Sequence, residues 1–451
     1  MHKWLFFSLI LYLSMITIGQ PTPPITTENA GDLSPFQVIS MGGFDHIDWS
    51  TDGNTLALAT FDGIAAYDTQ LQYQWQNIVD QGISQMFIAP DDQSILTLNY
   101  RGQLERWSID GFALDAPVVD ETINAATFTP SGDLITVGSA GILTRNLETG
   151  ETLTQAANPL EQPASALAVN PAGTEVTIVS CSAPSMGGDC FSDQVATYTI
   201  IDGTKVAEIP LPDNTDVTEV HYALDGATLA ISGYTQTYDE TTDQLNLLGA
   251  VQFWDGGTVT ATVSFPESRP VDTQFLPDGT LVVAAGEGIS IIDQTGTRVD
   301  AIDIPLFANA FDLSTDGTQL AIAGGGVVIY DLTQREIVLE RIGHNGLIAD
   351  LATVPGTDLL VSSSWDGTAR LWDLTTGTQL DRLDRDADAI YSDMEIVNNG
   401  SAMIIVTDRS LAQWAINPDG SFGAQSQAQV DVNGTIYSLE ASRDGSVILY
   451  G

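Results

Sequence analysis

Short apolar and β-branched runs alternate with turn signals from about residue 36 to the end of the chain. Runs of this kind, bounded by Gly, Pro, Asn, Asp or Ser, predict β-strands. Residues 343–380 show the pattern most clearly and predict four strands, at Leu347–Thr353, Leu359–Ser363, Ala369–Trp372 and about Gln379–Leu383. A sheet of four short strands cannot bury both of its faces alone, so copies of the unit must pack against one another.

The same four-strand frame recurs along the chain. The end of its third strand falls, in steps of roughly 40 residues, at Tyr67, Trp107, Asn146, Tyr198, Trp254, Ile292, Tyr330, Trp372 and Trp414. That step is the length of a four-stranded propeller blade. The pattern therefore predicts an all-β chain, a β-propeller region over residues 36–451 with about nine complete four-stranded blades and a partial tenth at Thr435–Gly451.

Two dipeptides within 343–380 carry a family resemblance. Gly343-His344 and Trp372-Asp373 stand where the WD40 family has its GH and WD pairs, so the stretch closely resembles a WD40 repeat. The resemblance implies a hydrogen-bonded set inside the blade, made by His344, Ser362, Asp366 and Trp372. A His–Asp–Ser catalytic set is the alternative, but all three residues match stabilising positions of the family. Other repeats depart from the pattern, because none of them has both pairs.

The number of blades leaves the closure of the propeller open. A ring of ten blades would exceed the usual range of about four to eight. Either the ring is unusually large, or the chain is the front part of a longer protein. A seven-blade ring with a split near Arg341, followed by an incomplete second array, is a further arrangement that the repeats allow.

Two repeats are longer than the others, and both excesses lie between the second and third strands. The insertions are Ser182–Asp193 and Tyr234–Leu248, in neighbouring blades. They are expected to lie side by side on one rim, where a rigid scaffold tends to carry its binding residues. Tolerated loop decoration is the alternative. Cys181 directly precedes the first insertion and Cys190 lies within it, close enough in sequence to form a disulfide in an oxidising compartment.

The N-terminus predicts export. A short basic start and an apolar run from Trp4 to Ile18 indicate a signal peptide at residues 1–19, although an uncleaved N-terminal anchor is an alternative. Residues 20–35 are rich in Pro and Thr and predict an extended linker. The mature protein is therefore expected outside the cell, in the periplasm or at the cell surface.

Charge narrows the choice of partner. The chain has 59 acidic and 14 basic residues, a net charge of −45. Such a surface repels nucleic acid and anionic lipid and favours cationic partners. We therefore expect a protein partner, no nucleic acid, and no membrane contact beyond the possible anchor. The sequence leaves the oligomeric state open.

A search for chemistry finds no catalytic motif. There is no nucleophile elbow, P-loop, dinucleotide fingerprint or zinc-protease helix motif, and the chain has only 4 histidines. We predict no catalytic, cofactor-binding or metal-binding residues and a non-catalytic, protein-binding scaffold. The alternative is a lactonase- or hydrolase-like propeller enzyme with a metal in its central channel. That site would need Glu, Asn, Asp or His residues converging from several blades, and the sequence shows no such set.

Overall fold

The computed structural model describes residues 44–451, with gaps at 61–62, 80–81, 116–121, 161, 183–192, 240–243, 287, 345–347, 385–390, 408–409, 426–429, 432–435, 437 and 443. The predicted signal peptide (1–19) and linker (20–35) lie outside the described residues. Within the described ranges, no helix has the length and apolar character that a membrane crossing requires.

The first seven sheets each contain four strands in sequence order. The first four are β1–β4 (His46–Trp49, Thr55–Thr60, Gly63–Asp68, Tyr73–Ile78), β5–β8 (Ile83–Ile88, Ser94–Asn99, Leu104–Ser108, Ala113–Leu114), β9–β12 (Ile123–Phe128, Leu134–Gly138, Gly141–Arg145, Thr152–Ala156) and β13–β16 (Ala164–Val169, Glu175–Cys181, Asp193–Thr199, Lys205–Ile209). The next three are β17–β20 (Thr215–Tyr222, Thr228–Asp239, Gln244–Asp255, Thr258–Pro266), β21–β24 (Pro270–Phe275, Leu281–Ala285, Gly288–Ile292, Arg298–Asp303) and β25–β28 (Ala308–Leu313, Gln319–Gly324, Gly326–Asp331, Glu336–Ile342).

Three further sheets follow in the chain. They are β29–β32 (Ile348–Thr353, Leu359–Ser364, Thr368–Asp373, Gln379–Asp384), β33–β37 (Tyr391–Val397, Ala402–Thr407, Ser410–Ile416, Phe422–Gln425, Val430–Asp431), with the short 3-10 helix η2 (Asn398–Gly400), and β38–β39 (Leu439–Ala441, Ile448–Tyr450). The prediction of an all-β propeller with nine complete blades and a partial tenth is confirmed. The four strands predicted in 343–380 are found at β29–β32 with ends shifted by at most one residue.

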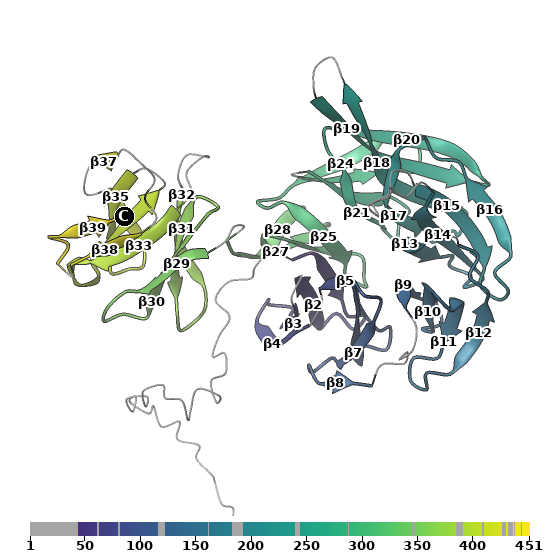
Figure 1. Ribbon diagram of the computed structural model, residues 1–451, viewed down its shortest axis with the longest axis horizontal. Coiled ribbons are helices and arrows are strands. Elements are labelled where there is room, and N and C mark those ends of the chain that lie inside the picture. Colours follow the sequence, from purple (N-terminus) through teal and green to yellow (C-terminus); the bar gives the residue numbers. More distant parts are fainter. Residues whose placement is uncertain are drawn as a thin grey trace, which may run out of the picture. The chain divides into compact units, whose positions relative to one another are not determined.

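The first seven sheets close into a ring (Figure 1). Their inner strands contact one another in the order β1, β5, β9, β13, β17, β21, β25, and β25 returns to contact β1. Buried Trp49 and Leu58 of the first blade pack with Ala321 and Val327 of the seventh. The Trp49 N–H also donates to Asp312 Oδ2 at 2.7 Å across this junction. Of the arrangements that the sequence left open, the structure thus has a seven-bladed ring ending at β28, with three further sheets after it.

Glycine shapes the turn between the first two strands of most blades. In these turns the glycine N–H donates to the carbonyl three residues earlier, as Gly226 does to Ala223 and Gly317 to Ser314. The glycine then adopts a positive φ of 71° in both turns, a conformation that costs other residues strain. Asp92 takes this place in the second blade, with a φ of 56°.

The two predicted insertions differ in what the structure describes. Residues 183–192 of the first insertion lie outside the described residues. The second was predicted as a rim loop, and the structure corrects this, because the chain continues as strand. β18 and β19 pair along their whole length, from Thr228 with Asp255 to Asp239 with Gln244. The insertion therefore lengthens a regular hairpin, which projects from the ring in Figure 1.

Candidate functional site

The structure brings His344, Ser362, Asp366 and Trp372 together inside one blade. His344 Nδ1 lies 3.0 Å from Asp366 Oδ2, and His344 Nε2 lies 2.6 Å from Ser362 Oγ. The Trp372 indole N–H donates to Ser362 Oγ at 2.8 Å. One tautomer satisfies every contact, because Nδ1–H donates to the carboxylate while the serine hydroxyl donates to Nε2.

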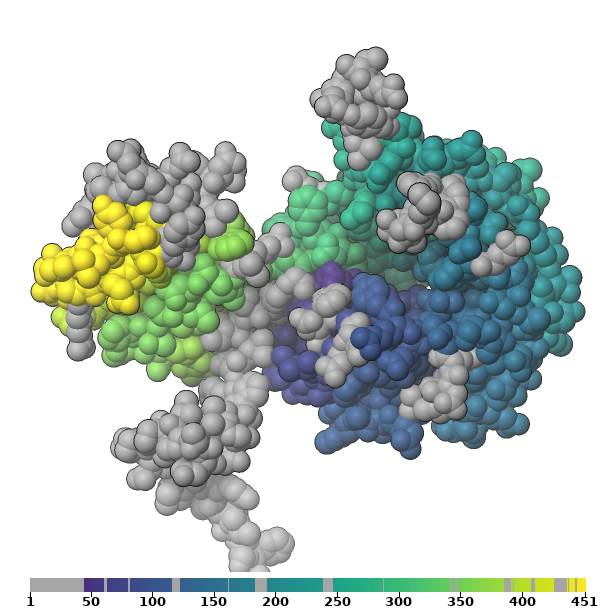
Figure 2. All heavy atoms as spheres, in the orientation of Figure 1, coloured from purple at the N-terminus to yellow at the C-terminus, as the bar shows by residue number. Residues whose placement is uncertain are grey.

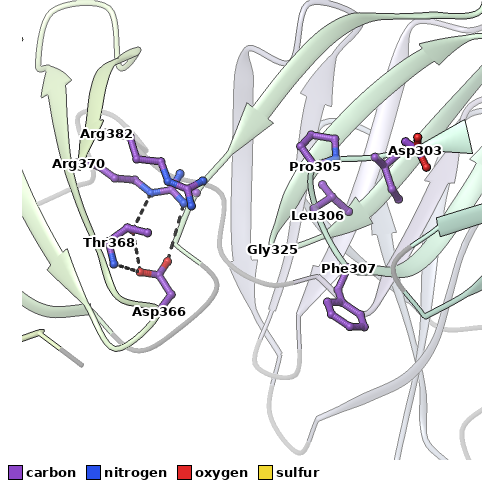
Figure 3. Close-up of a pocket in the computed structure, with 11 residues that line it drawn as sticks. Asp303, Pro305, Leu306, Phe307, Gly325, Asp366, Thr368, Arg370 and Arg382 are labelled. Carbon is purple, nitrogen blue, oxygen red and sulfur yellow. Dashed lines mark hydrogen bonds and ion pairs between the residues drawn. The ribbon is translucent and has the colours of Figure 1, made fainter. Parts of the chain in front are cut away.

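Two residues that sequence reasoning missed extend this network. Thr368 Oγ1 lies 3.0 Å from His344 Nδ1 and donates to Asp366 Oδ1 at 2.7 Å. Arg370 Nε donates to Thr368 Oγ1 at 3.3 Å, and its guanidinium approaches Asp366 Oδ2 at 3.8 Å (Figure 3). Both follow Asp366 at alternate positions, which is a signal that the strand period could have provided.

Burial keeps the histidine and the serine of this network away from substrate. The His344 side chain is 2% exposed, and Ser362, Trp372 and Arg370 are buried. Burial, followed by the charge of Arg382, lowers the pKa of Arg370 to about 10. A serine nucleophile needs an open approach to its hydroxyl, whereas Ser362 Oγ is held between an imidazole and an indole. The arrangement fits a role in stabilising the blade.

The predicted disulfide involves a residue outside the description. Cys181 is the last residue of β14, paired with Asp193 of β15. Cys190 lies outside the described residues, so the Cys181–Cys190 bond stays a prediction.

A second set of polar residues lies on the inner strands of the ring, where the sequence search had found no convergent set. Glu219 and His221 of β17, Asp272 of β21, Asp312 of β25 and Asp48 of β1 come from four consecutive blades. His221 Nε2 lies 3.5 Å from Glu219 Oε2. This corrects the expectation that no such set converges from several blades. The sequence did not show the set, because its members lie on the inner strands of different blades and no sequence motif links them.

Each Asp of this set also joins its blade to the next. Asp272 Oδ2 accepts from the Phe311 N–H at 2.8 Å, and Asp312 and Asp48 accept in the same way from Trp49 and Ile88. Because a carboxylate accepts from the backbone of the following blade, these acids connect neighbouring inner strands around the ring.

Burial dominates the acid–base behaviour of the set. It raises the pKa of Asp272 to about 8, with help from the charge of Glu219. Burial also raises the pKa of Asp48, well above its usual range, and that of Asp312. Burial alone would lower the pKa of His221, but the hydrogen bond and charge of Glu219 outweigh it and the net pKa is raised. With a pKa of about 8, the Asp272 carboxyl is mostly protonated at neutral pH. Among the described residues, no group of three or more His, Cys, Asp or Glu side chains is arranged to hold a metal ion.

The long hairpin creates a third candidate site. β18 and β19 are 12 residues each, whereas β14 and β15 of the preceding blade are 7. Leu229, Ile231 and Trp254 of the fifth blade pack against the fourth. The longer sheet therefore continues past the described strands of its neighbour, and the hairpin projects from the teal part of the ring (Figure 1, Figure 2).

A pocket of about 290 Å³ lies on the continuing face. Its floor comes from cross-strand rows such as Gly233–Ala250–Ser264 and Ile231–Gln252–Thr262. Leu211 and Pro212, which follow β16, form one side, and Leu248 lies toward the hairpin with 46% of its surface exposed. None of the described residues that line it has a charged side chain. The described residues thus form a mostly apolar recess at the base of the insertion that the sequence singled out.

Comparison with known proteins confirms the resemblance. The family described as WD domain, G-beta repeat matches residues 335–373, which include both dipeptides noted above. Denticleless protein homolog of Danio rerio is 40% identical over 86 residues, 18% of this chain and 13% of that protein. Small ribosomal subunit protein RACK1y of Oryza sativa subsp. japonica is 30% identical over 128 residues, 28% of this chain and 38% of that protein.

Serine-threonine kinase receptor-associated protein of Gallus gallus is 28% identical over 160 residues, 33% of this chain and 45% of that protein. The chain thus spans less than half the length of these relatives. Among solved structures, Kuenenia stuttgartiensis Hydrazine Synthase is similar with a TM-score of 0.52 and 14% identity, covering 68% of this chain and 97% of that chain. At that identity the likeness shows the propeller fold alone.

Proposed function

Because the chain carries a WD40 repeat on a propeller scaffold, we propose that it is an exported, non-catalytic protein that binds a protein partner. The observation that carries the proposal is the open sheet face beside the β18–β19 hairpin. A rigid ring holds this face in place, and rigid scaffolds commonly bind through segments that extend beyond their regular elements. Export is proposed from the apolar N-terminal run, Trp4 to Ile18, and places the partner outside the cell, in the periplasm or at the cell surface.

The relatives support a binding role in general terms. Two of them are named as a ribosomal subunit protein and a receptor-associated protein, and both names describe association with other components. This chain is proposed to share the principle of assembly and not those particular partners.

The test is capture of a partner on the immobilised chain. Residues 20–451 are exposed to envelope and culture-supernatant proteins, and bound proteins are identified by mass spectrometry. One variant replaces residues 237–246 by an Asn-Gly turn, and a second replaces 183–192 by a short Gly-Ser turn. A saturable partner that both changes remove supports the proposal.

The matched control alters the same strand junction in another blade. Ser139 and Ala140 join β10 to β11 directly, and converting them to Asn-Gly introduces the same turn chemistry without touching the hairpin. Capture that survives both shortened variants would refute the assignment of this rim. A folded chain that captures no protein would refute the scaffold role.

A catalytic role of the central channel is the second candidate, favoured only by the Glu219, His221 and Asp272 set. Turnover of lactones or esters by the purified chain, abolished in Asp272→Asn, would support it. Absence of turnover over a range of such substrates would leave the inner acids as links between blades.

A further inference from the structure

The apolar pocket at the base of the hairpin has the size of a socket for one side chain. Small-molecule pockets commonly enclose about 300–1,000 Å³, and this one encloses about 290 Å³. It is therefore at the lower limit for a whole small ligand. Interfaces between proteins, in contrast, commonly place one anchor side chain into a recess of this kind.

The lining selects an apolar anchor. Leu211, Pro212, Ile231, Leu248 and Ala250 supply hydrocarbon surface to the pocket. Uncharged polar groups of the lining come from Thr215, Tyr234, Thr235, Gln252, Thr262 and Ser264. A charged side chain placed inside would lose its hydration and would find no ionic partner among the described lining residues, which is costly. An aliphatic or aromatic side chain would instead exchange water for hydrocarbon contact.

The surroundings select cationic residues on either side of that anchor. The chain carries a net charge of −45, and exposed Asp213 and Glu267 flank the pocket along the chain. Asp216 adds a third carboxyl beside the pocket, because it hydrogen-bonds to Tyr234. Two cations lie nearby as well: Arg269 is 5.9 Å from the centroid of the Tyr234 ring, and Arg298 donates to the Ser264 carbonyl oxygen at 2.8 Å. Charge complementarity thus favours a basic segment. It disfavours a second copy of this acidic chain and any anionic surface.

We infer that this pocket receives one apolar side chain from a lysine- and arginine-rich segment of a protein partner. The inference rests on the proposed scaffold function and specifies its contact. The apolar side chain enters between Leu211 and Leu248, while the basic residues on each side meet the acidic surface around it.

The probe is a fluorescein-labelled nine-residue peptide with a central tryptophan and two basic residues on each side. Two comparison peptides replace the tryptophan by serine or the basic residues by glutamine. Binding to the purified chain is followed by fluorescence anisotropy. The first peptide is expected to bind saturably, and each comparison peptide is expected to bind about tenfold more weakly or worse.

Two variants test the pocket itself. Leu248→Lys removes an apolar wall and adds a repelling charge, and Ser264→Trp fills the recess from the outer strand, where an aromatic residue suits the sheet. Each is expected to raise the dissociation constant by about tenfold or more. The matched control is Leu153→Lys on β12, because Leu153 is an exposed strand leucine, at 48%, in another blade. It should change the constant by less than about twofold.

Several results would overturn the inference. If the serine peptide binds as tightly as the tryptophan peptide, charge alone attracts the peptide. The same conclusion follows if Leu153→Lys weakens binding as much as Leu248→Lys does. Equal binding of the glutamine peptide would assign the pocket to uncharged apolar ligands. Self-association that Leu248→Lys abolishes would assign it to a second copy. If no peptide binds while the chain still captures a partner that requires residues 237–246, the scaffold function stands and this inference falls.

Discussion

At the scale of single residues, the buried network around His344 makes the neighbouring residues Ser362 and Ser363 contribute differently to stability. We predict that Ser362→Ala lowers the free energy of unfolding of its blade by about 1–3 kcal/mol, because two buried partners lose their hydrogen bond. These partners are His344 Nε2 and Trp372 Nε1. Hydrogen exchange of peptides covering β30 and β31, read by mass spectrometry, measures this local opening free energy.

The adjacent serine is the control for that prediction. Ser363 is fully buried, and its Oγ has no hydrogen-bond partner among the described residues. Ser363→Ala therefore removes an unsatisfied polar atom and should leave the blade equally stable or slightly more stable. Equal losses in both variants would show that the network around Ser362 contributes nothing beyond packing.

Asp272 makes the ring sensitive to pH. Its pKa is raised from 3.8 to about 8 by burial and by Glu219, so between these values the folded state holds a proton that the unfolded chain has released. The stability linked to this proton is complete below pH 3.8 and is lost as the pH rises through about 8, with a slope of at most about 1.4 kcal/mol per pH unit. We predict that Asp272→Asn reduces the fall of the thermal midpoint between about pH 5 and 9.

The amide keeps an oxygen that can accept from the Phe311 N–H, so the link between blades remains in Asp272→Asn. Asp293→Asn is the control, because hydrogen bonds from Thr295 and Thr297 lower the pKa of that exposed carboxyl. Its contribution to stability is present above 3.8 and is lost only as the pH falls further. An unchanged slope in Asp272→Asn would show that this carboxyl is not protonated in the fold.

The sequence predicted the residue set around His344 but did not predict the set of polar residues on the inner strands. His344, Ser362, Asp366 and Trp372 occur in one blade at spacings that match a known pattern. Glu219, Asp272 and Asp48 belong to three blades, and only the register of each inner strand brings them together. Apolar packing between blades sets that register, and the sequence of a single repeat does not reveal this packing.

At the scale of elements, the hairpin is expected to serve binding more than stability. Thr237 and Asn246, at the outer part of the described hairpin, are exposed. We predict that replacing residues 237–246 by Asn-Gly changes the free energy of unfolding by less than about 0.5 kcal/mol. Thermal unfolding followed by circular dichroism measures the effect.

A longer deletion in the same hairpin is the control for the shortened variant. A Cβ on Gly249 would lie 2.2 Å from the Ser268 carbonyl oxygen and 2.8 Å from Pro270, which shows how closely this strand meets the next blade. A cut that removes Gly249 should therefore lower the thermal midpoint. If the shallow cut lowers it equally, the tip supports the ring.

Strand positions were largely predictable because local rules determine them. Short apolar runs and the turn residues between them located the four strands of residues 343–380 within one residue of β29–β32. The length of β18 and β19 was missed because an insertion rich in Thr and Asp resembles a loop. Its pairing depends on a partner strand and not on its own composition.

At the scale of the whole molecule, closure of the ring was not predictable. Every blade has the same four-strand frame, so the repeats alone permit seven or ten blades in a ring. Closure depends on contacts between residues such as Trp49 and Asp312, which are 263 positions apart. Nothing local to either residue shows that they meet.

The closed ring predicts where the chain can be cut. Seven inner strands contact one another cyclically, and Trp49, Leu56 and Leu58 of the first blade pack on the seventh. We predict that residues 36–344 fold alone, with a cooperative thermal transition within a few degrees of the main transition of the whole chain. Circular dichroism and size-exclusion chromatography measure this. A chain of residues 36–305 lacks the seventh blade and exposes those three side chains, so its midpoint should fall by on the order of ten degrees or more, or the chain should aggregate. If 36–344 behaves like 36–305, the β1–β25 contact does not close the ring in solution.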